Sequence, residues 1–525
     1  MGVRYLVLIL FFLSGAYSAS AQVYKWVDED GRTHYSDKPP ASELESTHQT
    51  TPLKKQVLKT KNIPSYPQET VTFQVRKLLA KKDFNQLNAY LAKLQKKIDE
   101  NIVNEHDLYT AFYAFRIDDK SYEPLFNKWV ETTPDNYFAY LARARYYYGL
   151  GWMVRGHAWA SETKKEQMKE MSEYFNKAML DMATVFKKNN QSLVAYTTLI
   201  NIANTFGKDA EAAAATKKAL EIQPASFVVR NAYLNSIKPR WGGSYKQMAM
   251  FIEYSLRYVD DNPNLKCLAG EVLADKASMS SIQNAPNSAE KSYTQALSFA
   301  ECAPALYKRG KVRYRLKKYI EALEDFDRAI EIEPEVADYY YWRAQTYISI
   351  KNNKKAMLDI QYAVKLDPYD KKINASYERL LVREGYSLRH AKNKSYEIDK
   401  YNAALRINPN NADTYARRAR AYIAQGKNDL ALKDLDKAIK LEPNEIEHYV
   451  LIDFVLAKSR AWKKIIPYWD KFIALNPNSG RAYRNRGGTY YRMGDMKSAK
   501  RDAKRSAELG DLEGKDIYKR FFGGR

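Results

Sequence analysis

The chain has 525 residues, enough for several domains, and its 21 Gly and 18 Pro are few for that length, which argues against a loop-rich β-sandwich, a collagen-like chain or a low-complexity chain. Its two cysteines exclude a disulfide-rich scaffold, a four-cysteine zinc site and a cysteine-ligated iron–sulfur cluster, and no two of its six histidines have zinc-motif spacing, so we expect no metal site. The 85 Lys and Arg against 62 Asp and Glu give a net charge of +23, which predicts attraction to polyanions.

Residues 1–21 have the pattern of a secretory signal peptide. Arg4 precedes an apolar run from Tyr5 to Leu13, which is too short to span a bilayer at about 20 residues. The run is followed by Ala19-Ser20-Ala21, an A-x-A cleavage site, and the alternative is an uncleaved N-terminal anchor. We therefore expect export, no transmembrane segment in the mature chain, and no nucleic-acid partner despite the charge.

Residues 22–40 are predicted to form a short β-hairpin module. The runs Val23–Val27 and Thr33–Ser36 are β-prone and flank the turn residues Asp28–Gly31. The arrangement W-V-D-x-x-G-x-x-H-Y-S-D-x-P-P resembles a bacterial module known as domain of unknown function 4124. That resemblance implies a protein of the bacterial periplasm or cell envelope and assigns no chemistry. Residues 41–68 are polar and contain three prolines, which predicts a flexible linker.

A 34-residue period marks the C-terminal half. It separates Pro334 from Pro368, Pro409 from Pro443, and Pro443 from Pro477, whereas Pro368 and Pro409 are 41 residues apart, so one repeat carries an insertion. Within each period, small residues recur at fixed offsets and large ones fill the rest. Small residues let two antiparallel helices approach, and the proline stops the second helix, so each period predicts a helix–turn–helix unit that must stack on its neighbours.

The residues at these offsets resemble the tetratricopeptide repeat. Leu306, Gly310, Ala322, Phe326 and Ala329 fit that family's signature. The resemblance implies six repeats over 303–510, and the excess of Lys and Arg at the C-terminal end predicts a basic tail at 511–525. Looser echoes over 69–302 predict a helical region with degenerate repeats, and its segments Gly151–His157 and Lys238–Tyr245 resemble domain of unknown function 4034. The predicted fold is therefore all-α, a tetratricopeptide-repeat superhelical solenoid behind a small β-hairpin module.

Candidate binding residues follow from this resemblance, because the first helix of each repeat lines the concave face in the family. The partner-binding positions expected there are Tyr307, Lys311, Tyr341, Gln345, Arg417, Arg420, Arg484, Asn485 and Tyr491. A second candidate is the loop with Arg240 and Trp241, which is either a contact surface or a structural turn. Export permits a disulfide between Cys267 and Cys302, but the sequence leaves their pairing open.

The sequence contains no nucleophile elbow, zinc-protease or P-loop motif, so we expect no enzyme and no cofactor. The favoured function is an exported, non-catalytic scaffold that binds a protein or peptide with acidic groups, because arginine, lysine and tyrosine suit carboxylates. The alternatives are a module binding anionic cell-envelope glycan and an enzyme hidden in the N-terminal helical region. The oligomeric state cannot be predicted from these patterns.

Overall fold

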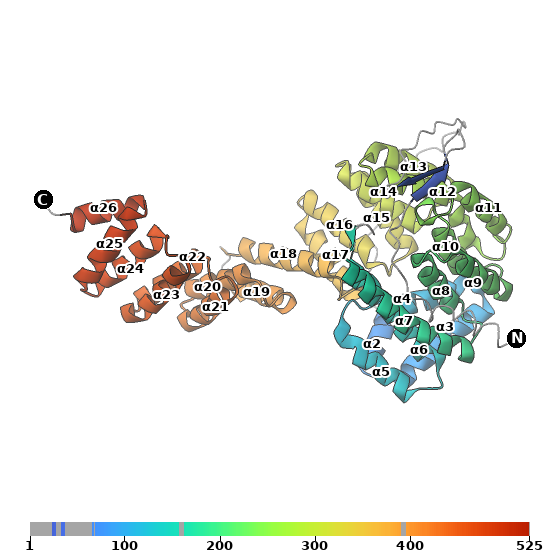
Figure 1. Cartoon of the computed structure of the whole chain (residues 1–525), viewed down its shortest axis with the longest axis horizontal. Helices are drawn as coiled ribbons and strands as arrows, with labels where there is room; N and C mark the ends of the chain where they lie inside the picture. The colour runs from blue at the N-terminus through green and yellow to red at the C-terminus, as the bar shows by residue number, and fades with distance from the viewer. Residues whose placement is uncertain are drawn as a thin grey trace. The chain divides into compact units, whose positions relative to one another are not determined.

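The computed structural model of the chain describes residues 24–27, 33–36, 66–67, 69–156, 162–389 and 395–523. The expected signal peptide and nearly all of the expected linker lie outside the described residues. The described part is almost entirely α-helical, which confirms the predicted all-α class (Figure 1). The chain divides into two compact units, Met1–Asp370 and Lys371–Arg525, hereafter unit 1 and unit 2. The sequence pattern predicts a boundary at residue 303. In the structure the first two regular repeats, residues 303–370, belong to the same unit as the N-terminal helices.

Two short strands precede the helices. The backbones of β1 (Tyr24–Val27) and β2 (Thr33–Ser36) pair antiparallel, with Tyr24 opposite Ser36 and Val27 opposite Thr33. The rest of the segment 22–40 lies outside the described residues, so a folded hairpin module there stays a prediction.

Unit 1 is built of consecutive helices that pack mainly against their neighbours in sequence. The longest buried cluster runs from α2 to α10 and is rich in Leu, Ala and aromatic side chains, among them Phe112 and Trp129. The helices are α2 (Val71–Ala80), α3 (Phe84–Glu100), α4 (Glu105–Tyr113), α5 (Glu123–Thr132), α6 (Tyr137–Arg155), α7 (Lys165–Lys188), α8 (Leu193–Thr205), α9 (Asp209–Ile222), α10 (Phe227–Ser236), α11 (Tyr245–Leu256), α12 (Glu271–Ile282), α13 (Pro286–Phe299), α14 (Ala303–Arg315), α15 (Tyr319–Ile332), α16 (Ala337–Ser349) and α17 (Asn353–Leu366). Short 3₁₀ turns are η1 (Ile102–Asn104), η2 (Lys120–Tyr122), η4 (Pro239–Trp241) and η5 (Pro263–Gly270).

The first helix of unit 1 docks on its last repeats, so this run of helices closes on itself. The two carboxylate oxygens of Glu335 accept the backbone N–H groups of Val71 and Thr72, each at 2.9 Å. These N–H groups begin α2 and have no intrahelical acceptor, and the positive end of a helix favours a carboxylate at this position. Glu335 follows the proline that ends α15, so a side chain from the regular repeats caps the start of the helical region.

Further contacts complete this closure. Arg76 donates to the carbonyl of Leu366 and lies 3.6 Å from the carboxylate of Asp367, at the end of α17. The Tyr66 hydroxyl donates to Asp359 at 2.8 Å, and the Tyr362 hydroxyl donates to the Pro67 carbonyl at 3.0 Å. Tyr66 and Pro67, which the sequence assigns to a flexible linker, are therefore packed against the repeats by their own hydrogen bonds.

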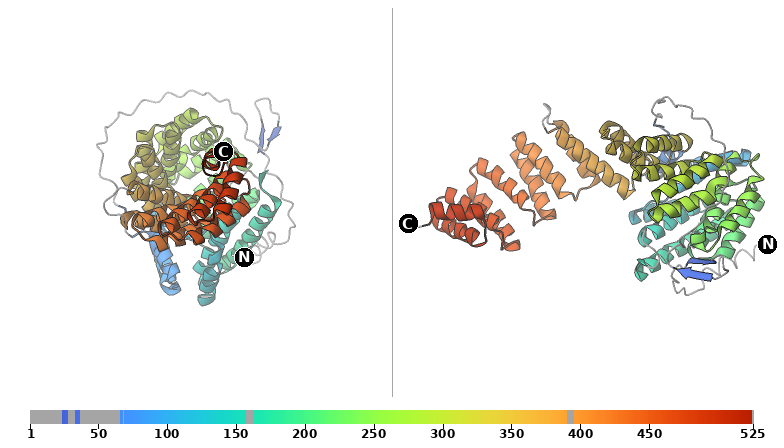
Figure 2. Two further views of the ribbon diagram at one scale, coloured as in Figure 1. Left: turned by 90° about the vertical axis from the view of Figure 1, so that its left-hand side faces the viewer. Right: turned by 90° about the horizontal axis from the view of Figure 1, so that it is seen from above.

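Unit 2 continues the pattern of helix pairs from α18 to α26, which follow one another in colour order in Figure 2. Its main apolar cluster lies between α20 and α24 and includes Trp469, Phe472 and Tyr449. The helices are α18 (Lys371–Ser387), α19 (Ser395–Ile407), α20 (Ala412–Ala424), α21 (Asn428–Leu441), α22 (Ile446–Lys458), α23 (Trp462–Leu475), α24 (Gly480–Arg492), α25 (Met496–Glu508) and α26 (Leu512–Phe521).

The stretch expected to be a basic tail is helix α26 for most of its length. The Asp511 side chain accepts the N–H of Gly514 and the hydroxyl of Ser506, which starts the helix and ties it to α25. A Cβ on Gly514 would lie 2.0 Å from the Ser506 hydroxyl, so glycine permits this close approach. Residues 512–521 of the expected basic tail are therefore helical.

Candidate functional site

A buried arginine joins successive repeats and sets their register. Arg343, on α16, is 2% exposed and holds Asp359 of α17 through two hydrogen bonds of 2.6 and 2.8 Å. Its remaining terminal nitrogen donates to Asp327 of α15, in the preceding repeat, at 2.7 Å. Burial alone would lower the pKa of Arg343, but the two carboxylates outweigh burial and raise it. Arg343 is therefore a fixed cation that bonds two repeats together.

The same arrangement recurs along both units. Each arginine bonds an aspartate 16 residues later, and most of them also bond an aspartate or asparagine 16 residues earlier. The pairs are Arg309 with Asp325, Arg418 with Asp434 and Asn402, and Arg486 with Asp502 and Asp470. In the degenerate region, Arg143 bonds Asn127, also 16 residues earlier, and Asp181. The N-terminal helices thus share the interior geometry of the regular repeats.

Arg417 and Arg420, both predicted to bind a partner, flank the structural Arg418 on α20. The Arg417 guanidinium lies 2.7 Å from Asp413 and 5.7 Å from the ring centre of Tyr386. Arg420 is exposed, and within the described part of the chain it has no hydrogen-bond or ion-pair partner. Sequence reasoning missed Arg418, although its 16-residue spacing to Asp434 recurs in the sequence.

A basic hollow of about 310 Å³ lies between α18 and α20 in unit 2. Arg379, Arg383 and Arg417 line it together with Tyr386 and the carboxylates of Glu378 and Asp413. Arg379 and Arg383 are exposed and, among the residues that the structure describes, have no ion-pair partner. The hollow therefore presents cationic side chains beside an aromatic ring, a combination that suits carboxylate groups.

Arg484, Asn485 and Tyr491 lie on α24, at the other end of unit 2. Arg484 is 14% exposed in its side chain and forms ion pairs with Asp511 and Glu513, so it helps to hold α26 in place. Tyr491 is 46% exposed and lines a mainly apolar hollow of about 300 Å³ between α24, α25 and α26. Asn485 is half-buried on the same helix.

The remaining predicted residues belong to unit 1, so the nine positions fall in two separate units. The Lys311 ammonium lies 5.0 Å from the ring centre of Tyr307 and 5.2 Å from that of Trp342. Tyr341 is 7% exposed, and Gln345 is half-buried on the same helix, α16. Tyr307 and Tyr341 are consequently packed within their repeats more than they are presented to solvent.

The loop with Arg240 and Trp241 is a turn that builds a buried ion cluster. Gly242 adopts φ = 96°, and a Cβ on Gly243 would lie 2.0 Å from the carbonyl of Ile237, so glycine is required at both positions. Arg240 consequently reaches Asp275 of α12 at 2.8 Å. Of the two interpretations that the sequence left open, the contacts of Arg240 match the structural turn, while Trp241 stays half-exposed.

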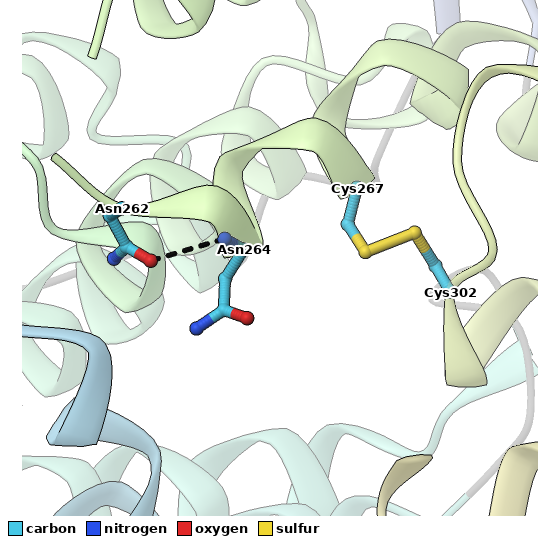
Figure 3. Close-up of a disulfide and its surroundings, with 4 residues drawn as sticks. All are labelled: Asn262, Asn264, Cys267 and Cys302. Atoms are coloured by element: carbon cyan, nitrogen blue, oxygen red, sulfur yellow. Dashed lines mark hydrogen bonds between the residues drawn. A yellow bond between two sulfur atoms is a disulfide. The ribbon is translucent and has the colours of Figure 1, made fainter. Parts of the chain in front are cut away.

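Cys267 of η5 and Cys302, which precedes α14, form a disulfide in the structure (Figure 3). Their Cα atoms are 5.6 Å apart, within the range that the bond requires. The neighbouring Asn262 accepts the backbone N–H of Asn264 at 3.2 Å and so starts η5. The bond ties the degenerate region to the first regular repeat.

Asn262 also takes part in a buried polar cluster around Glu105. The carboxylate of Glu105 accepts hydrogen bonds from the hydroxyl of Ser226, the backbone N–H of Phe227 and the amide of Asn262, at 2.6, 2.6 and 3.1 Å. Burial raises the pKa of Glu105 to about 7, although the hydrogen bonds oppose that shift. Glu105 therefore links α4 to α10 and η5 and titrates near neutrality.

Family comparisons agree with this geometry. Models of the tetratricopeptide repeat match residues 303–336, 337–370 and 412–445. The chain contains tetratricopeptide repeats. Two models described as domains of unknown function also match, DUF4124 over residues 10–72 and DUF4034 over residues 71–211. The DUF4034 match ends at residue 211, before the segment Lys238–Tyr245 that the sequence pattern assigns to the same domain.

Curated relatives match about two fifths of the chain. The Hsp70-Hsp90 organizing protein of Triticum aestivum is 27% identical over 207 residues, 38% of this chain and 34% of that protein. The mitochondrial import receptor subunit TOM70 of Homo sapiens is 25% identical over 201 residues, 38% of this chain and 33% of that protein. The matched stretch thus spans about a third of these relatives, and the matches indicate no catalytic family.

Solved structures with similar helices include YrrB, described as a tetratricopeptide-repeat protein with an unusual peptide-binding site, which is 23% identical, with a TM-score of 0.29 over 37% of this chain and 94% of its own. Yeast Tom70 is 17% identical, with a TM-score of 0.26 over 86% of this chain and 94% of its own. Among the described residues of the repeat protein, no helix is both long and apolar enough to cross a membrane. No group of three metal-ligating side chains is found in that part of the chain either.

Proposed function

We propose that this repeat protein is an exported, non-catalytic scaffold that binds a protein or peptide partner on the concave face of its repeats. The observation that carries the proposal is the basic hollow between α18 and α20, where Arg379, Arg383 and Arg417 surround a single space. These three guanidinium groups face only two carboxylates, Glu378 and Asp413, so an acidic group that enters the hollow balances the remaining positive charge. The names of the relatives, an organizing protein and an import receptor subunit, agree with a role in binding other proteins.

The test removes one arginine from each wall of the hollow. The test variant is the full chain with Arg383→Ala and Arg417→Ala. The control variant carries Lys433→Ala and Lys437→Ala, which remove the same charge from exposed positions of α21. Partners are first captured by crosslinking in cells, and the isolated partner is then titrated against each variant. We expect the arginine pair to weaken binding at least about tenfold, because losing about 1.4 kcal/mol of binding free energy is a factor of ten.

The lysine pair should change the affinity little at physiological salt. Equal weakening by both pairs would contradict recognition in the hollow and would favour diffuse attraction. That result would support the second candidate, an anionic cell-envelope glycan, which the net charge of +23 favours. A glycan held by diffuse charge should also dissociate steeply as salt rises.

The export part of the proposal rests on residues 1–21 and on the disulfide. The bond between Cys267 and Cys302 suits an oxidising compartment such as the periplasm. We propose in addition that residues 22–40 form a hairpin module at the mature N-terminus, around the paired strands β1 and β2. Mass spectrometry of the mature protein tests export: a chain that still begins at Met1 in the cytoplasm would contradict it.

A further inference from the structure

A second pocket lies in unit 1, next to the disulfide. It has a volume of about 130 Å³, and its walls come from α10, η5, α12 and α14, with both Cys267 and Cys302 among its lining residues. Pockets for drug-sized ligands usually measure about 300–1,000 Å³. This pocket is therefore the size of a single chemical group or a very small molecule.

The pocket is charged because the Arg240 loop and α12 meet beneath it. Lys238 is 3% exposed and lies 3.4 Å from Glu271 and 3.6 Å from Asp275, and Arg240 lies 2.8 Å from the same Asp275 oxygen. These two cations and two carboxylates balance one another. Lys308 of α14 then adds an ammonium group to the pocket wall.

Lys308 differs from the other cations of this cluster. Within the residues that the structure describes, it has no hydrogen-bond or ion-pair partner. Burial lowers its pKa, and the positive charges of Lys238 and Arg240 lower it further against the opposing effect of Glu271 and Asp275. Glu333 also lines the pocket, but its carboxylate accepts the Tyr339 hydroxyl at 2.9 Å. The three cations of the cluster are thus matched in number by three carboxylates, but none of these carboxylates lies within ion-pair distance of the Lys308 ammonium.

We infer that this pocket binds a carboxylate group, with the ammonium of Lys308 as its counter-ion and the buried pair of Lys238 and Asp275 as the fixed floor. A bound carboxylate would give the Lys308 ammonium the direct partner that it lacks, and an ammonium–carboxylate contact is stronger in a desolvated pocket than in water. The carboxylate can belong to a small free acid or to the acidic side chain of a protein. Because the pocket is formed by unit 1 alone, this inference is independent of the hollow between α18 and α20.

The experiment measures how fast Lys308 reacts with an acetylating reagent in the full chain, quantified by peptide mass spectrometry. Succinate and N-acetylated tetraglutamate are the two probes, with sodium chloride at equal ionic strength as the reference. A bound carboxylate raises the pKa of Lys308, and each unit of that rise lowers the neutral, reactive fraction about tenfold. We expect at least one probe to slow acetylation of Lys308 about tenfold and to leave the exposed Lys317 unchanged.

Protection by succinate would identify a free acid as the source of the carboxylate, and protection by the peptide alone would identify a protein side chain. Calorimetry with the protecting probe then compares two variants. Lys308→Met should abolish binding, whereas Glu271→Gln should strengthen it, because it removes a competing negative charge from the pocket wall. Failure of both probes to protect Lys308, or equal protection of Lys317, would overturn the inference.

Discussion

The buried arginine of α16 offers a sharp test of how the repeats are held together. Arg343→Met removes the cationic partner of Asp359, which keeps only the Tyr66 hydroxyl, is 0% exposed and cannot recover the lost bonds from water. Breaking a buried ion pair from one side costs about 3–5 kcal/mol, because the other charge is left uncompensated. At roughly 2 °C per kcal/mol for a large domain, the melting temperature of unit 1 should fall by about 6–10 °C.

Two further variants separate this explanation from a general effect of losing an arginine. Arg328→Met removes a half-exposed arginine paired with Glu301 and Glu331 and should cost less than about 1 kcal/mol. Arg343→Met combined with Asp359→Leu removes both buried charges and should be less destabilising than the single change. Differential scanning calorimetry is the suitable assay, because two compact units need not melt in one transition. A single variant that melts with the wild type, or a double variant that melts below the single one, would refute the reasoning.

Three other changes have defined outcomes. Ala356→Trp should destabilise unit 1 by at least about 1–3 kcal/mol in a thermal melt, because this fully buried alanine lies where α17 packs against its neighbours; an unchanged melt would place the repeat register elsewhere. Changing Cys267 and Cys302 to serine together should cost about 3–4 kcal/mol, since the bond closes a loop of about 35 residues in the unfolded chain, and dithiothreitol should lower the wild-type melting temperature only. The folded protein keeps a proton on Glu105 up to a pKa of about 7, whereas the unfolded chain releases it near pH ~4.3, so stability should fall as pH rises between those values. Glu105→Gln should make the free energy of unfolding, measured by denaturant titration, less dependent on pH in this range. The same pH dependence in the variant and the wild type would mean that Glu105 is ionised throughout.

The sequence predicts the regular repeats well because their signal is local. Small residues at the helix crossing and a proline after the second helix recur every 34 residues, and helices α14 to α17 and α20 to α25 lie where that period puts them. The division of the chain at Asp370 could not be predicted in the same way. It depends on Glu335 capping the start of α2, a contact between residues more than 260 positions apart, and no periodic pattern records such a contact.

The candidate site was predictable only in part. A helix turns by about 100° per residue, so neighbouring arginines on α20 have very different surroundings. Arg417 lines the basic hollow, Arg418 is committed to Asp434, and Arg420 is exposed. The family resemblance places Arg417, Arg420 and Arg484 on the binding face. It does not show that Arg484 is occupied by Asp511 and Glu513 at the start of α26. The 16-residue arginine–aspartate spacing would have separated structural from available arginines.

The closure of unit 1 constrains how this protein can vary in length. Adding or deleting one helix pair between α2 and α15 would carry Glu335 away from Val71, so such a change would break the cap as well as the packing. Chain growth by whole repeats is therefore expected downstream of Asp370, where each pair contacts mainly its neighbours. The prolines that end the repeats from Pro334 to Pro477 are 34 residues apart except between Pro368 and Pro409, where the spacing is 41 residues. This longer interval begins next to Asp370. In homologous chains, gain and loss of repeats should accordingly be concentrated after α17, while the number of helix pairs before it stays constant.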